Sequence, residues 1–257
     1  MDLNLTGRVV LITGGSKGIG LACARAFLAE GAKVAIASRA RENLERAAQS
    51  LGPVAWVAAD LTRPEAGSEL VRAVESKLGP VDVLVNSAGA AKRTLPEDLD
   101  AQAWHAAMDA KYFTYIHAMQ AVLPAMAARG AGNVVNIIGM GGKVATSYHL
   151  PGGAANSALM LATVGLANVY GPKGIRINAI NPGATLTDRV KEALKLEAQV
   201  RKTSEEEVLA QGQARVPLRR YASAEEVADV ALFLASDKAS YVTGALIPMD
   251  GGSNPLI

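Results

Sequence analysis

The chain has 257 residues, half of them apolar, and its 26 basic and 24 acidic residues leave a formal net charge of +2. This composition supplies a sizeable core, and the near-balanced charge favours neither nucleic acid nor an anionic membrane as a partner. Cys23 is the single cysteine, which excludes an intrachain disulfide and favours a reducing compartment. The first seven residues lack the pattern of a signal peptide, and no uninterrupted apolar stretch reaches membrane-spanning length. We therefore expect a cytoplasmic protein.

Apolar runs typical of strands alternate with helical patterns along the whole chain. Strands are expected at residues 8–13, 33–38, 54–58, 81–85, 133–138, 175–180 and 245–249. Helices are expected at residues 21–30, 41–51, 64–78, 101–129, 154–170 and 224–236. Most strand runs are continuously apolar, as strands covered on both faces must be. The alternation predicts an α/β fold, a doubly wound (Rossmann) seven-stranded parallel sheet with helices on both faces, and residues 1–257 show no linker that would divide this domain.

Residues 186–220 interrupt the regular alternation between the sixth and seventh strands. The segment is long, charged and mostly helical in pattern. An excursion at the carboxyl edge of a doubly wound sheet is placed to cover a substrate. We therefore interpret residues 186–220 as a substrate-covering insertion, with Leu194, Leu196 and Val200 as apolar candidates for the pocket wall.

A glycine-rich turn at residues 13–20 joins the first strand to the first helix. Such a turn leaves backbone N–H groups and the positive end of a helix available to an anion. Gly14 permits the sharp turn, Gly18 lets a pyrophosphate approach the backbone, and Gly20 lets the helix pack closely on the strand. The turn predicts dinucleotide binding by Gly14, Ser16, Lys17, Gly18, Ile19 and Gly20.

The residues after the second and third strands bear on the form of the cofactor. A site for NAD uses Asp or Glu about twenty residues past the glycine turn, whereas a site for NADP uses positive charge. This chain has Ser38 and Arg39 there, with Lys17 in the turn itself. The pattern favours NADP(H) over NAD(H), although both cations could instead be solvated loop charges. Asp60, followed by Leu61, could accept from an adenine amino group or cap the next helix.

Several further motifs, in the right order, resemble those of the short-chain dehydrogenase/reductase family. The turn at residues 13–20 is similar to the family's TGxxxGxG pattern, and residues 86–89 resemble its NNAG motif, with Ser87 at the second position. Residues 181–183, with two threonines after them, resemble the segment that holds the nicotinamide carboxamide. The resemblance implies an NAD(P)-dependent oxidoreductase acting on an alcohol or a carbonyl compound. It adds these cofactor-binding candidates: Asn86, Ala88, Gly89, Pro182, Gly183, Thr185 and Thr187.

The resemblance also implies a catalytic set of Asn, Ser, Tyr and Lys, and this chain departs from all four. The serine position is Gly139 and the tyrosine position, thirteen residues on, is Gly152. The lysine position is Asn156, and the asparagine position is Lys111. The hydroxyl groups that polarise the carbonyl and carry its proton in this family are therefore missing from their usual places.

Two of the four departures form a reciprocal exchange, because Lys111 stands where the family has Asn and Asn156 where it has Lys. Our hypothesis is that Lys111 supplies the positive charge of the reaction centre and Asn156 bonds the nicotinamide ribose. The alternative is that Lys111 reaches solvent along Tyr112 and Tyr115 and takes no part in chemistry.

A proton donor must then come from elsewhere, and the loop that follows the fifth strand offers two candidates. Tyr148 and His149 are the candidates, because glycines on both sides let this loop fold over a ligand. A histidine titrates near neutrality and can act as acid or base without assistance. The alternative is that Tyr148 is only a surface aromatic.

Two functions therefore stay open at this point. One is an NADP(H)-dependent oxidoreductase with a rebuilt reaction centre, and the other is a catalytically silent NADP(H)-binding sensor or partner subunit. His105 and His117 have no second ligand at suitable spacing, so we expect no metal. The family resemblance implies a homo-oligomer, a dimer through the long helices or a tetramer.

Overall fold

The computed structural model describes residues 2–89 and 92–254, without the side chains of Arg189, Glu192 and Leu196, so one of the three apolar candidates of the insertion lies outside the described residues. One seven-stranded sheet organises these residues, in the order β3-β2-β1-β4-β5-β6-β7, and each strand pairs in parallel with its neighbours. The strands are β1 (Val9–Thr13), β2 (Lys33–Ser38), β3 (Ala55–Ala58), β4 (Val83–Asn86), β5 (Gly132–Ile137), β6 (Ile175–Pro182) and β7 (Leu246–Met249). The predicted doubly wound parallel sheet is confirmed.

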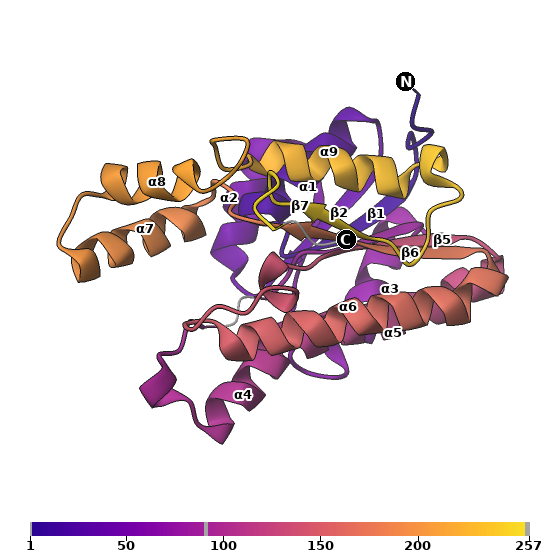
Figure 1. Ribbon diagram of the computed structural model, residues 1–257. Coiled ribbons are helices and arrows are strands. Elements are labelled where there is room, and N and C mark those ends of the chain that lie inside the picture. The colour runs from indigo at the N-terminus through magenta and orange to yellow at the C-terminus, as the bar shows by residue number, and fades with distance from the viewer. Residues whose placement is uncertain (1, 90–91, 255–257) are drawn as a thin grey trace.

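Helices cover both faces of the sheet (Figure 1). The first face carries α1 (Gly18–Ala29), α2 (Arg41–Leu51) and α9 (Ala224–Ala235). The second carries α3 (Ala66–Leu78), α5 (Thr114–Arg129) and α6 (Leu150–Tyr170). Short 3-10 turns lie at Pro96–Asp98, Met140–Gly142, Gly171–Lys173 and Asp237–Ala239.

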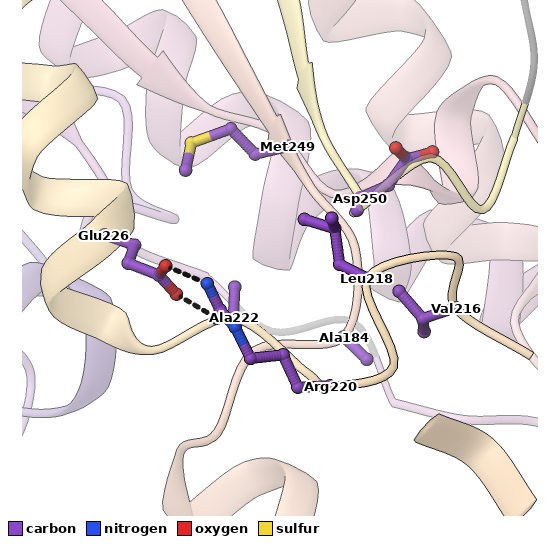
Figure 2. Close-up of a pocket in the computed structure, with 9 residues that line it drawn as sticks. Ala184, Val216, Leu218, Arg220, Ala222, Glu226, Met249 and Asp250 are labelled. Atoms are coloured by element: carbon purple, nitrogen blue, oxygen red, sulfur yellow. Dashed lines mark hydrogen bonds and ion pairs between the residues drawn. The ribbon is translucent and has the colours of Figure 1, made fainter. Parts of the chain in front are cut away.

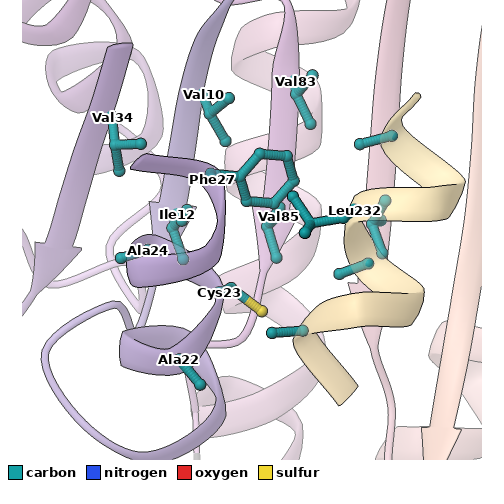
Figure 3. Close-up of a cluster of buried hydrophobic side chains, with 14 of the residues drawn as sticks. Val10, Ile12, Ala22, Cys23, Ala24, Phe27, Val34, Val83, Val85 and Leu232 are labelled. Atoms are coloured by element: carbon teal, nitrogen blue, oxygen red, sulfur yellow. The ribbon is translucent and has the colours of Figure 1, made fainter. Parts of the chain in front are cut away.

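Strand periodicity explains the two hydrophobic cores. Val10 and Ile12 of β1 point to the first face, whereas Val9 and Leu11 point to the second, because successive side chains in a strand alternate. In the first core, Phe27 of α1 lies over the sheet, beside Leu232 of α9 (Figure 3). Cys23 lies in the same core, where burial raises the pKa of its thiol to about 12 and leaves it unreactive near neutral pH.

The predicted helix at residues 101–129 is not continuous. It consists of α4 (Ala101–Ala107), a π-helical turn (Met108–Phe113) and α5. Thr114 Oγ1 donates to the carbonyl oxygen of Lys111 at 2.9 Å, and a β-carbon on Gly89 would overlap the carbonyl oxygen of Ala110. The apolar pattern did not indicate this turn, because buried residues resume the helical spacing directly after it, in α5. Such turns are frequent at functional sites.

Helix α6 begins earlier than predicted, at Leu150, with Pro151 in its first turn, where a missing N–H costs nothing. Gly152 and Gly153 are therefore helical and do not belong to the loop. Residues Leu150–Lys173 are, within the described residues, the one helix long and apolar enough to cross a membrane, with a mean hydropathy of 1.2. Half of its most apolar 18-residue stretch is buried in the protein, as a central core helix requires.

The insertion at residues 186–220 contains α7 (Asp188–Arg201) and α8 (Glu205–Ala214). These two helices form a hairpin that projects from the body of the molecule (Figure 1). Lys202 ends α7 in the left-handed region, with φ 52°. Val200 on the hairpin is 75% exposed, so it does not line an enclosed pocket wall in this structure.

Candidate active site

The glycine turn after β1 is closed by contacts that leave no room for side chains. A β-carbon on Gly14 would lie 2.6 Å from the carbonyl oxygen of Ser87, and one on Gly20 would overlap the carbonyl oxygen of Gly14. Gly14 and Gly18 also have positive φ values, 68° and 52°. The turn therefore brings the start of α1 close against the segment that follows β4.

The N-terminus of α1 points out of this turn without a side-chain cap. Its cap residue is Lys17, which makes no capping hydrogen bond, and its first turn has no acidic residue. Helix N-termini usually satisfy their N–H groups with a side chain or with an anion. Ser16, Lys17 and Ile19 surround this end, and none of the three is buried. The arrangement fits the pyrophosphate of a dinucleotide.

The candidates for the adenosine end lie together after β2 and β3. Arg39 is exposed, and its positive charge acts on Asp60. Partial burial raises the pKa of Asp60, but hydrogen bonds from Thr62 and the charges of Arg39 and Arg63 outweigh it, so the net pKa lies below the usual value. Ser38 Oγ donates to the carbonyl oxygen of Ala40 at 3.4 Å, and Leu61 is buried, 4% exposed.

Asn86 takes part in a buried chain of hydrogen bonds across the sheet. Its Oδ1 accepts from Thr13 Oγ1 at 3.2 Å, and its Nδ2 donates to Asn136 Oδ1 at 3.0 Å. Thr13 Oγ1 also accepts from the backbone N–H groups of Ser87 and Ala88, both at 3.3 Å. Asn86 is fully buried, so its side chain positions the turn at Ala88 and Gly89 rather than facing a ligand.

The segment after β6 lies opposite the glycine turn. The backbone N–H of Gly183 donates to the carbonyl oxygen of Met249 at 3.0 Å. This bond fixes Pro182, the last residue of β6, against β7. Thr185 is 4% exposed, and its Oγ1 donates to the carbonyl oxygen of Gly183 at 3.3 Å. Thr187 Cγ2 lies 3.4 Å from the position of a β-carbon on Gly18, so the two predicted parts of the cofactor site face each other.

Lys111 turns inward from the π-helical turn and does not run out to solvent. Its Nζ donates to Tyr115 Oη at 2.6 Å and to the carbonyl oxygen of Ile137, the last residue of β5, at 3.1 Å. Tyr115 Oη donates to the same carbonyl at 2.5 Å, and the ammonium lies 4.3 Å from the centre of its ring. A positive charge is therefore fixed at the carboxyl end of β5.

Asn156 lies on α6, which packs on the same face of the sheet as α5. It is 5% exposed, and its Nδ2 lies 3.5 Å from the position of a β-carbon on Gly139. The 3-10 turn after Gly139 is held to α6 by Ser157, whose Oγ donates to the carbonyl oxygen of Gly142 at 2.5 Å. Lys111 thus lies at Ile137 and Asn156 beside Gly139, two residues further on, and the roles that the reciprocal exchange gives them stay a prediction.

His149 occupies the space beside Gly152. A β-carbon on Gly152 would overlap Cε1 of His149 and lie 2.5 Å from Nε2 and 2.8 Å from Nδ1. Two backbone hydrogen bonds fix the backbone of His149. Its N–H donates to the carbonyl oxygen of Thr146 at 3.0 Å, and its carbonyl oxygen accepts from the N–H of Gly153 at 2.7 Å. The imidazole is therefore held at the helix start where a side chain on residue 152 would begin.

Tyr148, the other candidate donor, is 56% exposed. Its carbonyl oxygen accepts from the N–H of Thr94 at 3.2 Å, which ties its loop to the segment after β4. The structure thus places His149 next to Gly152 and gives the Tyr148 ring a largely solvent-facing position.

A cavity of about 170 Å³ lies beside Ala184, between the end of the insertion and the end of β7 (Figure 2). Apolar side chains of Val216, Leu218 and Met249 line it, together with an ion pair. In that pair Arg220 donates to both carboxylate oxygens of Glu226, at 2.7 and 2.6 Å. Arg220 is thereby committed to a structural contact.

The fold and this site define a dinucleotide-binding α/β protein with its reactive groups at the carboxyl edge of the sheet. Residues 14–254 match the family model described as enoyl-(acyl carrier protein) reductase. The chain is 36% identical over 256 residues to galactitol 2-dehydrogenase (L-tagatose-forming) of Cereibacter sphaeroides, covering 96% of this chain and 95% of that protein. It belongs to the short-chain dehydrogenase/reductase family of oxidoreductases.

Solved structures agree with this assignment. The L-sorbose reductase of Gluconobacter frateurii, complexed with NADPH and L-sorbose, superposes with a TM-score of 0.94 at 30% identity, over 100% of both chains. A xylitol dehydrogenase bound to NAD⁺ superposes with a TM-score of 0.91 at 29% identity, over 97% of this chain and 100% of that one. Proteins of this fold therefore include users of both nicotinamide cofactors.

Two residues of the reaction centre were not among those predicted from the sequence. Tyr115 accepts from Lys111, and the spacing of four residues in a helix could have indicated the pair. Ser157, which anchors the turn after β5, has no sequence signal because its partner is a backbone carbonyl.

Proposed function

We propose that this protein is an NADP(H)-dependent oxidoreductase that interconverts an alcohol and a carbonyl compound through a rebuilt reaction centre. The observation that carries the proposal is the position of His149. Its imidazole fills the space in which the family's tyrosine side chain would begin, over Gly152. A titratable group thus stands where this fold needs one.

The residues present fit a nicotinamide dinucleotide. The uncapped start of α1 suits the pyrophosphate, and Thr187 lies against Gly18 beside this helix start. Asn156 lies at the position of the family's ribose-binding lysine, and its buried Oδ1 has no hydrogen-bond partner among the described residues. A ribose hydroxyl would supply the missing donor.

Each side chain then has a defined task in carbonyl reduction. When bound, NADPH supplies the hydride that forms the new C–H bond as the carbonyl π bond breaks. His149 gives its proton to the carbonyl oxygen, completing the alcohol, and takes it back in the oxidative direction. Lys111 contributes positive charge beneath the site, where negative charge develops on the oxygen.

The preference for NADP(H) is part of the proposal. Arg39 and Lys17 are both exposed at the adenosine side, and together they could pair with a 2′-phosphate. Asp60 weakens the attraction of these two cations for a phosphate, because its carboxylate offsets part of the positive charge of Arg39. We expect a measurable but not absolute preference.

A catalytically silent NADP(H)-binding sensor or partner subunit is the second candidate function. It is favoured by Gly139 and Gly152, which remove both hydroxyl groups of the family set. The sensor would bind NADPH tightly and reduce no carbonyl compound.

The remaining proposals concern the surroundings of the site. We propose that residues 186–220 cover the substrate, since Val216, Leu218 and Arg220 of this segment wall the cavity beside Ala184. We also propose a cytoplasmic homo-oligomer, dimer or tetramer, that does not bind nucleic acid. Exposed apolar side chains support oligomerisation: Leu161 is 76% exposed, Val169 59%, and Tyr241 fully exposed.

The test is NADPH oxidation in the presence of a panel of ketones, aldehydes and ketoses, with NADP⁺ reduction by the matching alcohols. The proposal predicts turnover in both directions with at least one pair. Tight NADPH binding without turnover across the panel would favour the sensor instead.

A further inference from the structure

Asn156 has a buried acceptor that the protein itself does not satisfy. The residue is 5% exposed, and Oδ1 has no hydrogen-bond partner among the described residues. Buried side-chain polar atoms are nearly always hydrogen-bonded, so an orphaned one in a candidate site indicates a donor that arrives with a ligand. The ribose hydroxyl proposed above satisfies this atom.

The other end of the amide borders an open space. A β-carbon on Gly139 would meet one described atom within 4 Å, Nδ2 of Asn156 at 3.5 Å. This is the position of the family's serine, whose hydroxyl polarises the carbonyl. The serine is missing here, and an amide N–H group lies beside the space that it leaves.

Gly141 connects this amide with His149. A β-carbon on Gly141 would lie 3.4 Å from Cδ2 of His149 and 3.8 Å from Nδ2 of Asn156. The imidazole and the amide therefore flank the same glycine, above the strand end where Lys111 binds the carbonyl oxygen of Ile137. A hydrogen-bond donor and an acid thus converge on one small volume.

We propose that Asn156 is a catalytic residue that replaces the missing serine: Nδ2 donates to the carbonyl oxygen of the substrate, while Oδ1 accepts from the cofactor ribose. The inference rests on the proposed function and extends it, because ribose binding alone uses only one end of the amide. A fixed donor at the oxygen stabilises the negative charge that develops there.

The test separates the two ends of the amide. Asn156→Asp keeps the shape and an acceptor oxygen but removes the N–H donor, so we expect kcat to fall about a hundredfold. We expect its Kd for NADPH, measured by fluorescence, to change less than about threefold. Asn156→Leu removes both groups and should weaken NADPH binding about tenfold as well. Asn168→Asp, the same change at an exposed position of α6, is the matched control and should match the wild type.

The outcomes are distinguishable. An active wild type with an Asn156→Asp variant that keeps kcat, or an Asn156→Leu variant that keeps NADPH affinity, overturns this inference and leaves the proposed function standing. A wild type that binds NADPH but reduces no carbonyl compound overturns the proposed function and, with it, the role of Nδ2.

A measurement on the wild type guards against variants that fail to fold. The side-chain ¹⁵N amide resonance of Asn156 should shift when NADPH is added. It should shift again when NADP⁺ is followed by the alcohol turned over fastest, or by propan-2-ol if the panel gives no turnover. A resonance unmoved by both additions would show that the amide is only structural and would overturn the inference.

Discussion

The imidazole of His149 and the missing side chain of Gly152 are two halves of one arrangement. The ring lies where a β-carbon on residue 152 would stand, so the glycine is the condition for the histidine's position. Residue 152 is the tyrosine position of the family. A tyrosine there would exclude the ring of His149 from its present position, so the histidine can occupy this space only because the tyrosine is absent.

Gly152→Ala should therefore reduce activity without reducing stability. The added β-carbon would displace the ring of His149, and we expect kcat to fall about tenfold or more. Alanine favours a helix over glycine by about 1 kcal/mol, so thermal unfolding should occur at the same or a higher temperature. Gly165→Ala on the same helix, where a β-carbon meets nothing within 4 Å, is the control and should keep full activity. Equal activity in both variants would refute the role of this space.

Arg39→Ala should weaken NADPH binding selectively. A charge-assisted hydrogen bond to phosphate contributes about 1.5–3 kcal/mol, so the Kd for NADPH should rise about ten- to a hundredfold while that for NADH changes little. Arg41→Ala is the matched control, because Arg41 is engaged by Glu45 at 2.9 Å and by the Trp56 ring at 5.2 Å. Parallel weakening of both cofactors by Arg39→Ala, measured by fluorescence titration, would contradict a 2′-phosphate contact.

Lys111→Met should slow turnover, because it removes the charge at the end of β5 while keeping a long side chain. We expect kcat to fall about tenfold or more. Lys173→Met provides the comparison, since Lys173 also lies over a tyrosine ring, that of Tyr170 at 5.2 Å, but at the far end of α6. NADPH affinity and turnover that both stay unchanged in Lys111→Met would reduce Lys111 to a structural role.

Glu226 should make stability depend on pH in the acid range. Its hydrogen bonds from Arg220 and from the backbone of Ser223 lower its pKa from 4.5 to about 2. A carboxylate with a lowered pKa in the folded state stabilises above its unfolded pKa, and this contribution is lost as the pH falls toward 2. The melting temperature of the wild type should therefore fall more steeply in this window than that of Glu226→Gln. Glu225→Gln should follow the wild-type curve, and a constant gap between wild type and Glu226→Gln would contradict the linkage.

The sheet could be predicted from the sequence because short, continuously apolar runs are typical of strands that are covered on both faces. The glycine turn at residues 13–20 was equally readable, since Gly14 and Gly20 are required by backbone contacts that any side chain would break. Local pattern and global fold agree at these positions, so the inference is direct.

The reaction centre was harder to predict, because its geometry depends on contacts between distant segments. The sequence placed Tyr148 and His149 as equals in one loop, and nothing in their order showed that one ring would turn over Gly152. The π-helical turn that directs Lys111 inward likewise has no clear signal in the sequence, because buried residues resume the helical spacing directly after it, in α5. The roles of residues that depart from the family pattern depend on their positions in space, and the sequence alone does not give those positions.

The most direct test of the central claim is the single-turnover rate of NADPH oxidation by His149→Gln and Tyr148→Phe, each measured by stopped-flow absorbance at saturating carbonyl substrate. If His149 supplies the proton, the first variant should be about a hundredfold slower than the wild type, and the second within about threefold of it. A His149→Gln variant as fast as the wild type would contradict the account.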